Sequence, residues 1–248
     1  MTGTAISAAE GRLMAVDDEK GSLADPALQL IRLGVDVLLA TEVDEAELLA
    51  RQEGRRLRGV LMPSTSDDLR IDEVIEAIGP AAGIDALGIA LLGARLDDDR
   101  IDELRVRGLR WRLWAPYQDR DLRFLGRSLL WAGSDDNLRL DGRVPTALPG
   151  FAGRRGETRS VLVGDLSPAG AFLETPSPFP AGSQIEVEIA LPGGSVTLRA
   201  TVRWVSPSNQ RPPSGRAHGF GVEFVAPTKD VVSQLLEHID CEFKRFML

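Results

Sequence analysis

The chain of 248 residues is long enough for two domains of roughly 100–150 residues each, and its hydrophobic content of 43% is sufficient for two cores. Its formal net charge of −8 argues against a general DNA- or RNA-binding surface, because nonspecific nucleic-acid binding requires clustered positive charge. The single cysteine excludes an intramolecular disulfide, and the single cysteine and two histidines do not form a zinc motif. We therefore expect no structural metal, and an anionic ligand would require a local basic site.

No apolar run approaches the roughly 18 residues that span a bilayer. Residues 1–10 also lack the order of basic and then apolar residues that marks a secretory signal. The sequence therefore predicts a soluble, cytoplasmic protein with no membrane insertion.

Short apolar runs alternate with helix-like segments in the first half of the chain. The apolar runs cover residues 13–16, 35–40, 59–62, 87–92 and 110–115. The segments with apolar residues at helical spacing are 24–34, 45–56, 71–78, 98–107 and 119–131. This alternation predicts an α/β domain over residues 1–132, with a five-stranded, doubly wound parallel sheet of the flavodoxin-like type.

Two motifs in this half resemble those of response-regulator receiver domains, namely Val16-Asp-Asp-Glu19 and Ala115-Pro-Tyr-Gln-Asp119. The resemblance implies an aspartate after the third strand that accepts a phosphoryl group, an acid pair that holds Mg²⁺, and a hydroxyl and a lysine that contact the phosphate. Here Met62-Pro-Ser64 stands at the acceptor position, Gly93 at the hydroxyl position and Ala115 at the lysine position. We therefore interpret residues 1–132 as a pseudo-receiver domain.

The pseudo-receiver leaves several functional alternatives open. Asp17 and Asp18 could bind Mg²⁺, but only two oxygen-bearing side chains are visible, which favours a solvated turn or a helix start. The fourth and fifth helices could form a surface for a homodimer or for an unknown protein partner. Seven arginines lie in or near these helices, at positions 105, 107, 110, 112, 120, 123 and 127. Such a cluster is more often a solvated face than a binding patch.

The second half changes in character after the Gly-, Ser-, Asp- and Asn-rich residues 132–137, so we place a linker at residues 133–138. Short β-rich segments follow at residues 144–151, 158–163, 171–175, 184–191, 195–205 and 219–225. They predict an all-β, six-stranded antiparallel barrel, closed by an amphipathic helix over residues 228–243 with Thr228 as its N-cap. We expect four aromatic side chains to lie in the barrel core: Phe172, Trp204, Phe220 and Phe224.

Three motifs in this half occur in a specific order. They are Arg139-x-x-x-Arg143 followed by Val144-Pro145, then Asp165-x-Ser167-x-x-Gly170, and finally Gly219-Phe-Gly-Val-Glu-Phe224. Together they resemble the PilZ domain, the bacterial receptor module for cyclic di-GMP, over residues 139–248. Two arginines four apart carry little information alone, but the combination of motifs at this spacing is specific.

The resemblance implies a cyclic di-GMP site made of Arg139, Arg143, Asp165, Ser167 and Gly170, and the chemistry of each residue fits. Arginine matches both phosphate and the O6 and N7 atoms of guanine, and Asp165 can accept the guanine N1 and N2 hydrogens. Ser167 can bond a phosphate or a base edge, and Gly170 permits close approach. Taken singly, Asp165 and Ser167 are more typical of a local cap, Gly170 of a turn and Arg139 of a solvated linker.

We therefore predict a cyclic di-GMP receptor that is not an enzyme and has no cofactor, since no nucleophile–base pair or P-loop is recognisable. Ligand binding at the arm between the domains is expected to change the domain arrangement and the binding of a partner. The alternative is a ligand-independent scaffold that acts through protein contacts of the pseudo-receiver. Leu138 stands where many family members have a further arginine, and the missing cation predicts one ligand per domain. The resemblance also implies a role in motility, pilus function, exopolysaccharide production or biofilm control.

Overall fold

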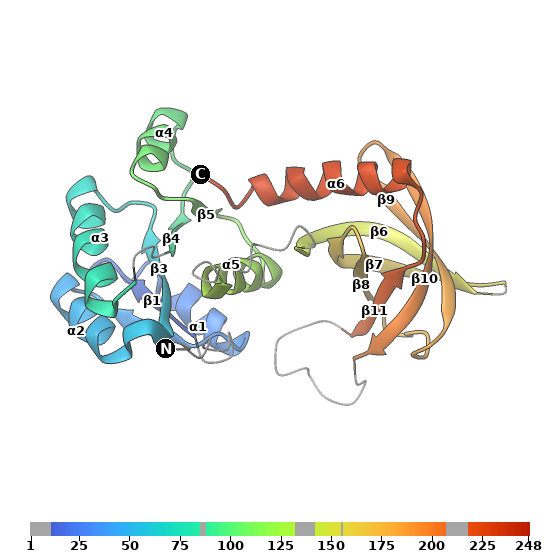
Figure 1. The fold of residues 1–248 in the computed structure, drawn as a ribbon, viewed down its shortest axis with the longest axis horizontal. Coiled ribbons are helices and arrows are strands. Elements are labelled where there is room, and N and C mark those ends of the chain that lie inside the picture. Colours follow the sequence, from blue (N-terminus) through green and yellow to red (C-terminus); the bar gives the residue numbers. More distant parts are fainter. Residues whose placement is uncertain (1–10, 85–87, 132–141, 155, 207–217) are drawn as a thin grey trace, which may run out of the picture. The chain divides into compact units, whose positions relative to one another are not determined.

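The computed structural model describes residues 11–84, 88–131, 142–154, 156–206 and 218–248 (Figure 1). The chain divides into two compact units, which we call the N-terminal unit (Met1–Leu138 with Arg245–Leu248) and the C-terminal unit (Arg139–Lys244). The linker predicted at residues 133–138 lies outside the described residues. The last four residues of the chain, which the sequence analysis places in the second domain, belong to the N-terminal unit.

The N-terminal unit is a doubly wound α/β fold, which confirms the predicted class. Its five parallel strands have the order β2-β1-β3-β4-β5. The strands are β1 (Arg12–Val16), β2 (Val37–Ala40), β3 (Leu57–Pro63), β4 (Gly88–Gly93) and β5 (Trp111–Trp114). The helices are α1 (Ala24–Arg32), α2 (Val43–Glu53), the 3-10 turn η2 (Gly54–Arg56), α3 (Asp68–Ala82), α4 (Asp98–Val106) and α5 (Asp119–Trp131).

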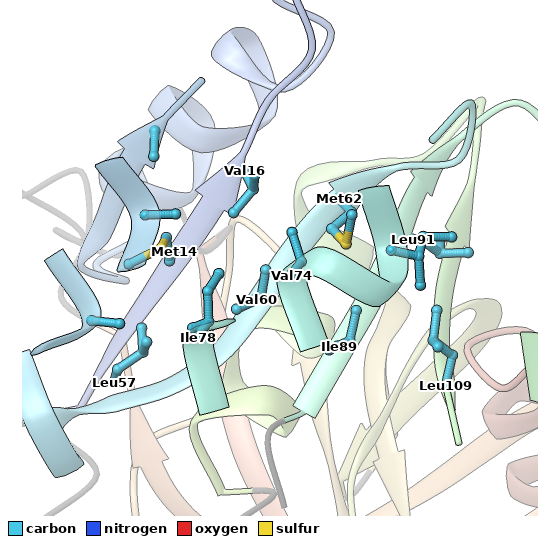
Figure 2. Packing of buried hydrophobic residues seen from close by; sticks show 14 of the residues in the cluster. Met14, Val16, Leu57, Val60, Met62, Val74, Ile78, Ile89, Leu91 and Leu109 are labelled. Atoms are coloured by element: carbon cyan, nitrogen blue, oxygen red, sulfur yellow. The ribbon is translucent and has the colours of Figure 1, made fainter. Parts of the chain in front are cut away.

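One face of this sheet forms a single apolar core with the helices that cover it. Figure 2 shows Met14, Val60 and Ile89, from three adjacent strands, beside Val74 and Ile78 of α3. Successive side chains of a strand point to opposite faces, so alternate residues of each strand enter this core. Burial of these aliphatic groups supplies the main favourable term in the stability of the unit.

The other face requires close approach of α5 to the sheet. A Cβ atom built on Gly59 of β3 would lie 3.0 Å from the Cβ of Leu129 in α5 and 3.3 Å from the side chain of Leu13. Glycine at this position therefore lets the helix lie close to the strand.

Two helices of this unit begin at aspartate caps. The side chain of Asp67 accepts a hydrogen bond from the backbone N–H of Arg70 at 2.9 Å, and that of Asp97 accepts from Arg100 at 2.8 Å. Such caps satisfy N–H groups that have no partner within the helix. They explain why α3 begins at Asp68, three residues before the predicted start.

The C-terminal unit is a closed antiparallel barrel, again as predicted, with the strand order β10-β11-β8-β7-β6-β9. Its strands are β6 (Val144–Arg154), β7 (Glu157–Ser167), β8 (Gly170–Glu174), β9 (Gln184–Leu191), β10 (Gly194–Val205) and β11 (Gly219–Phe224). Alternate residues of every strand fill the interior, among them Val163, Val187, Leu198 and Phe220. Closure leaves no unpaired sheet edge in the barrel.

Helix α6 (Lys229–Lys244) follows the last strand and contacts β6 and β7. Leu235 is fully buried, and Val231 and Ile239 pack against the barrel core from positions one helical turn to either side. The hydroxyl of Thr228 accepts from the N–H of Val231 at 3.4 Å, as expected of an N-cap. None of the helices in the described part of the chain has the length and apolar character needed to cross a bilayer.

Candidate functional site

The residues of the second predicted motif lie where β7 and β8 meet. Asp165 and Ser167 are at the end of β7, and Gly170 begins β8, so that Ser167 and Gly170 face each other across the ladder. Asp165 is also paired with Pro145 near the start of β6, just after Arg143. Barrel register thus brings the end of the first motif to the second, while Arg139 lies outside the described residues.

Arg143 and Asp165 form an ion pair on the outer surface of the barrel. Nη1 of Arg143 lies 3.1 Å from Oδ1 of Asp165, and their side chains are 41% and 19% exposed. Asp165 points outward because its neighbour Leu166 is in the interior cluster. A half-exposed pair of this kind contributes little to stability, but it holds a guanidinium group beside the end of β7.

Ser167 and Gly170 shape the turn itself. The Ser167 hydroxyl donates to the carbonyl oxygen of Gly170 at 3.0 Å and accepts from its N–H at 3.1 Å, and only 3% of Ser167 is exposed. A Cβ on Gly170 would lie 2.2 Å from the carbonyl oxygen of Val222 in β11. In the structure, therefore, Ser167 is a local cap and Gly170 permits close strand packing. Both support the position of Asp165.

The comparison with protein-family models decides the identity of this unit. The model described as "PilZ domain" matches residues 137–240, which include all three motifs, the six barrel strands and most of α6. The C-terminal unit is a PilZ domain.

Several solved structures are similar to part of the chain. The inhibitor of motility MotI/DgrA of Bacillus subtilis is 16% identical, with a TM-score of 0.34 over 41% of this chain and 49% of that one. The PilZ domain of YcgR from Escherichia coli, solved with c-di-GMP, is 18% identical, with a TM-score of 0.33 over 41% of this chain and 88% of that one. The MrkH–c-di-GMP complex of K. pneumonia is 20% identical, with a TM-score of 0.35 over 43% of this chain and 53% of that one. The chain thus spans about half the length of MotI and MrkH. A search among curated proteins gives no match.

The PilZ barrel carries an aromatic pair that continues the row of Asp165 across the sheet. Asp165 is paired with Phe172, Phe172 with Gly221, and Gly221 with Trp204. The rings of Phe172 and Trp204 are stacked, with centroids 5.3 Å apart and an interplanar angle of 10°. Trp204 is 36% exposed, whereas Phe172 beneath it is 3% exposed and lies outside the interior cluster.

Phe220 and Phe224 belong to the interior cluster as expected, and Phe172 is buried as expected, although it stacks on Trp204 outside that cluster. The sequence-based placement of Trp204 in the barrel core is wrong. The cause is a β-bulge between Val202 and Trp204, which shifts the alternation of β10. A Cβ on Gly221 would lie 2.2 Å from Nε1 of Trp204, so the indole occupies the space above this glycine. The glycine within β11 was the available signal for such close approach.

The receiver-like acids of the N-terminal unit are used locally. Oδ1 of Asp17 accepts from the backbone N–H groups of Asp18 and Leu23, both at 2.8 Å. Asp18 accepts from the N–H of Lys20 and from the N–H and hydroxyl of Ser22. Burial alone would raise the pKa of Asp18, but the bonds from Ser22 and Lys20 outweigh burial and lower it. Both carboxylates thus organise the turn before α1.

The other receiver positions meet at the same edge of the sheet without the required chemistry. Ser64, only 5% exposed, lies beside Gly93, where an added Cβ would be 2.6 Å from its hydroxyl, and the N–H of Ala115 donates to Gly93. Nη2 of Arg70 donates to the backbone carbonyls of Asp17 and Thr41, which follow β1 and β2. Within the described ranges, no three His, Cys, Asp or Glu side chains are grouped to hold a metal ion.

Proposed function

We propose that the PilZ domain binds cyclic di-GMP on the outer face of its barrel, and that binding changes the arrangement of the two units and the binding of a protein partner. The observation that carries the proposal is the pair of Arg143 and Asp165, which are 22 positions apart in the chain and meet at 3.1 Å at the β7–β8 turn. YcgR and MrkH have been solved with this nucleotide, which makes it the first ligand to test.

The chemistry of the pair suits this ligand. Cyclic di-GMP has two phosphodiester charges and two guanines, and an arginine fork can donate two parallel hydrogen bonds to a phosphate or to a guanine edge. Asp165 accepts from the guanine N1 and N2 hydrogens on the opposite side. In this proposal Arg139 supplies a second guanidinium, and Ser167 and Gly170 act through the turn that they shape.

The proposed change in the arrangement of the units follows from the position of Arg139 and Arg143 in the chain. Arg139 is the first residue of the C-terminal unit, so a ligand that holds both arginines also binds the segment that joins the units. A ligand shifts a conformational equilibrium by its difference in affinity for the two states. The differential contacts proposed here are those of Arg139 and Arg143.

Titration of the full-length protein with cyclic di-GMP tests this function. We expect saturable binding at micromolar or lower concentration, one ligand per chain, and a melting temperature that rises with ligand concentration, because a ligand that binds only the folded state stabilises it. Linear pGpG, which lacks the closed ring, is the matched control ligand. Absence of heat and of thermal shift at about 100 µM would contradict the receptor function, and two ligands per chain would contradict the stoichiometry.

The alternative function, a ligand-independent scaffold, is favoured by one observation. Arg143 and Asp165 already satisfy each other, and Ser167 and Gly170 are satisfied within the turn, so the motif could persist for the shape of the barrel alone. In that case the full-length chain would retain its protein partners in a pull-down with and without cyclic di-GMP.

Trp204 extends the proposed site. Its exposed indole lies on the cross-strand row of Asp165, and nucleobases stack on such surfaces at about 1–3 kcal/mol per base. We expect Trp204→Ala to weaken cyclic di-GMP binding by about tenfold. Trp204→Phe, which retains an aromatic face, should recover most of the affinity. Equal affinity of Trp204→Ala and wild type in calorimetry would remove this residue from the site.

A further inference from the structure

The last residues of the chain lie along an edge of the parallel sheet. β5 is the final strand in the sheet order, and the end of the chain is next to it in Figure 1. Trp111 of β5 and Met247 form an antiparallel bridge. The N–H of Arg112 donates to the carbonyl of Phe246 at 2.8 Å, and the N–H of Leu248 donates to that of Arg110 at 2.9 Å. We call Arg245–Leu248 the C-terminal clasp.

Two arginines of the N-terminal unit hold the backbone of the clasp. Nε of Arg105 in α4 donates to the carbonyl oxygen of Leu248 at 3.0 Å, and Nε of Arg112 donates to that of Arg245 at 3.4 Å. Bonds to carbonyl oxygens recognise an extended backbone rather than particular side chains. These two arginines, which the sequence analysis left as part of a solvated face or a binding patch, therefore bind the backbone of the clasp.

Two side chains anchor the clasp. Phe246 is fully buried, and its ring centroid lies 4.5 Å from that of Phe124 in α5. Leu248 is 7% exposed and belongs to the same buried cluster as Leu104 and Leu109. Met247 between them remains partly exposed. Main-chain hydrogen bonds with alternate buried side chains are the features by which protein domains bind extended peptides through strand addition.

We propose that the N-terminal unit contains a strand-addition groove for an extended segment of the type Phe-x-Leu, and that the C-terminal clasp is its resident, exchangeable occupant. A short segment with two ladder hydrogen bonds can open locally while the sheet remains folded. Release of the clasp exposes the edge of β5 and the surface around Phe124 to a segment of the same chemistry from a protein partner. This proposal does not depend on any nucleotide.

The connectivity gives the clasp a means of control. Arg245 directly follows Lys244, the last residue of α6, and α6 packs on the PilZ barrel through Val231, Leu235 and Ile239. A displacement of α6 would therefore be transmitted directly to the C-terminal clasp, because a single peptide bond joins the two.

Hydrogen exchange of the wild-type chain without nucleotide tests release directly. The N–H of Arg112 is bonded to the clasp, whereas the N–H of Ala115, just after β5, is bonded to Gly93 of β4 at 2.7 Å. We expect the amides of Arg112 and Leu248 to exchange with the same free energy of opening, because both are bonded across the clasp. Their exchange rates should be at least about tenfold higher than the rate of the Ala115 amide. Exchange of Arg112 at the rate of Ala115 would mean that the clasp opens only with the sheet, and would overturn the proposal.

A labelled peptide that corresponds to residues 242–248 tests the groove in trans. In full-length Phe246→Ala the clasp lacks its main anchor, so we expect fluorescence polarisation to show peptide binding at least about tenfold tighter than to wild type. Met247→Ala is the matched control and should behave as wild type, and a peptide that carries Phe246→Ala should bind neither protein. No binding to the Phe246→Ala chain with its circular dichroism intact, or equal binding to wild type, would overturn the proposal.

Discussion

Arg143→Ala should weaken the binding of cyclic di-GMP to the full-length protein by about ten- to a hundredfold. Hydrogen bonds to charged groups contribute about 1.5–3 kcal/mol each, and 1.4 kcal/mol corresponds to a factor of ten in the dissociation constant. Calorimetric titration at fixed salt concentration is the measurement. An affinity equal to that of wild type would remove Arg143, and with it the central contact, from the proposed site.

The same substitution should leave the fold almost unchanged, which separates lost contacts from lost structure. Arg143 is 41% exposed, and the half-exposed ion pair with Asp165 contributes about 0–1 kcal/mol. Arg143→Lys keeps the charge but loses the planar fork, so its affinity should be intermediate. Arg154→Ala is the matched control, because Arg154 ends the same strand and donates instead to Ser183 at 3.2 Å. It should bind as wild type does.

The order of strands and helices could be predicted from the sequence because each element carries its own period. The alternating segment at residues 184–191 is strand β9 without any change of boundary, and residues 119–131 are helix α5. Boundaries elsewhere shifted where a side chain caps the helix, as Asp67 does for α3. Local patterns decide such features, since the residues that specify them are neighbours in the chain.

The candidate site was only partly predictable, because it depends on register. The motifs identified Arg143 and Asp165, but their contact follows from the pairing of Asp165 with Pro145 across β6 and β7. The outward position of Trp204 depends on a one-residue bulge, which reverses the face of every later side chain in the strand. No local period reveals such a shift.

The C-terminal clasp was the least predictable feature. Phe246 follows an amphipathic helix, and from the sequence it could equally belong to one further turn of that helix. In the structure it packs on Phe124, more than 100 positions earlier in the chain. Its partners are a sheet edge and an aromatic ring that only the folded N-terminal unit brings together. Contacts of this range leave no signal in the four residues themselves.

Gly170→Ala should be the most destabilising substitution in the PilZ motif, and it separates the two explanations for this glycine. The new Cβ would lie 2.2 Å from the carbonyl oxygen of Val222, a backbone atom that cannot move aside without disturbing the pairing of β8 with β11. Overpacking costs about 1–3 kcal/mol, and loss of the buried bonds from Ser167 adds about 1–3 kcal/mol. We expect the melting temperature of the PilZ domain to fall by at least about 10 °C.

Gly193→Ala, in the turn between β9 and β10, is the matched control for Gly170→Ala, because no atom lies within 4 Å of the added Cβ. It should melt within about 4 °C of wild type, since a surface substitution costs at most about 0.5 kcal/mol. If Gly170 serves the fold, any loss of cyclic di-GMP affinity in Gly170→Ala should be accompanied by the fall in melting temperature. Normal melting with lost binding would instead mean that this glycine makes room for the ligand, and the close approach of β8 to β11 would not be the reason for its presence.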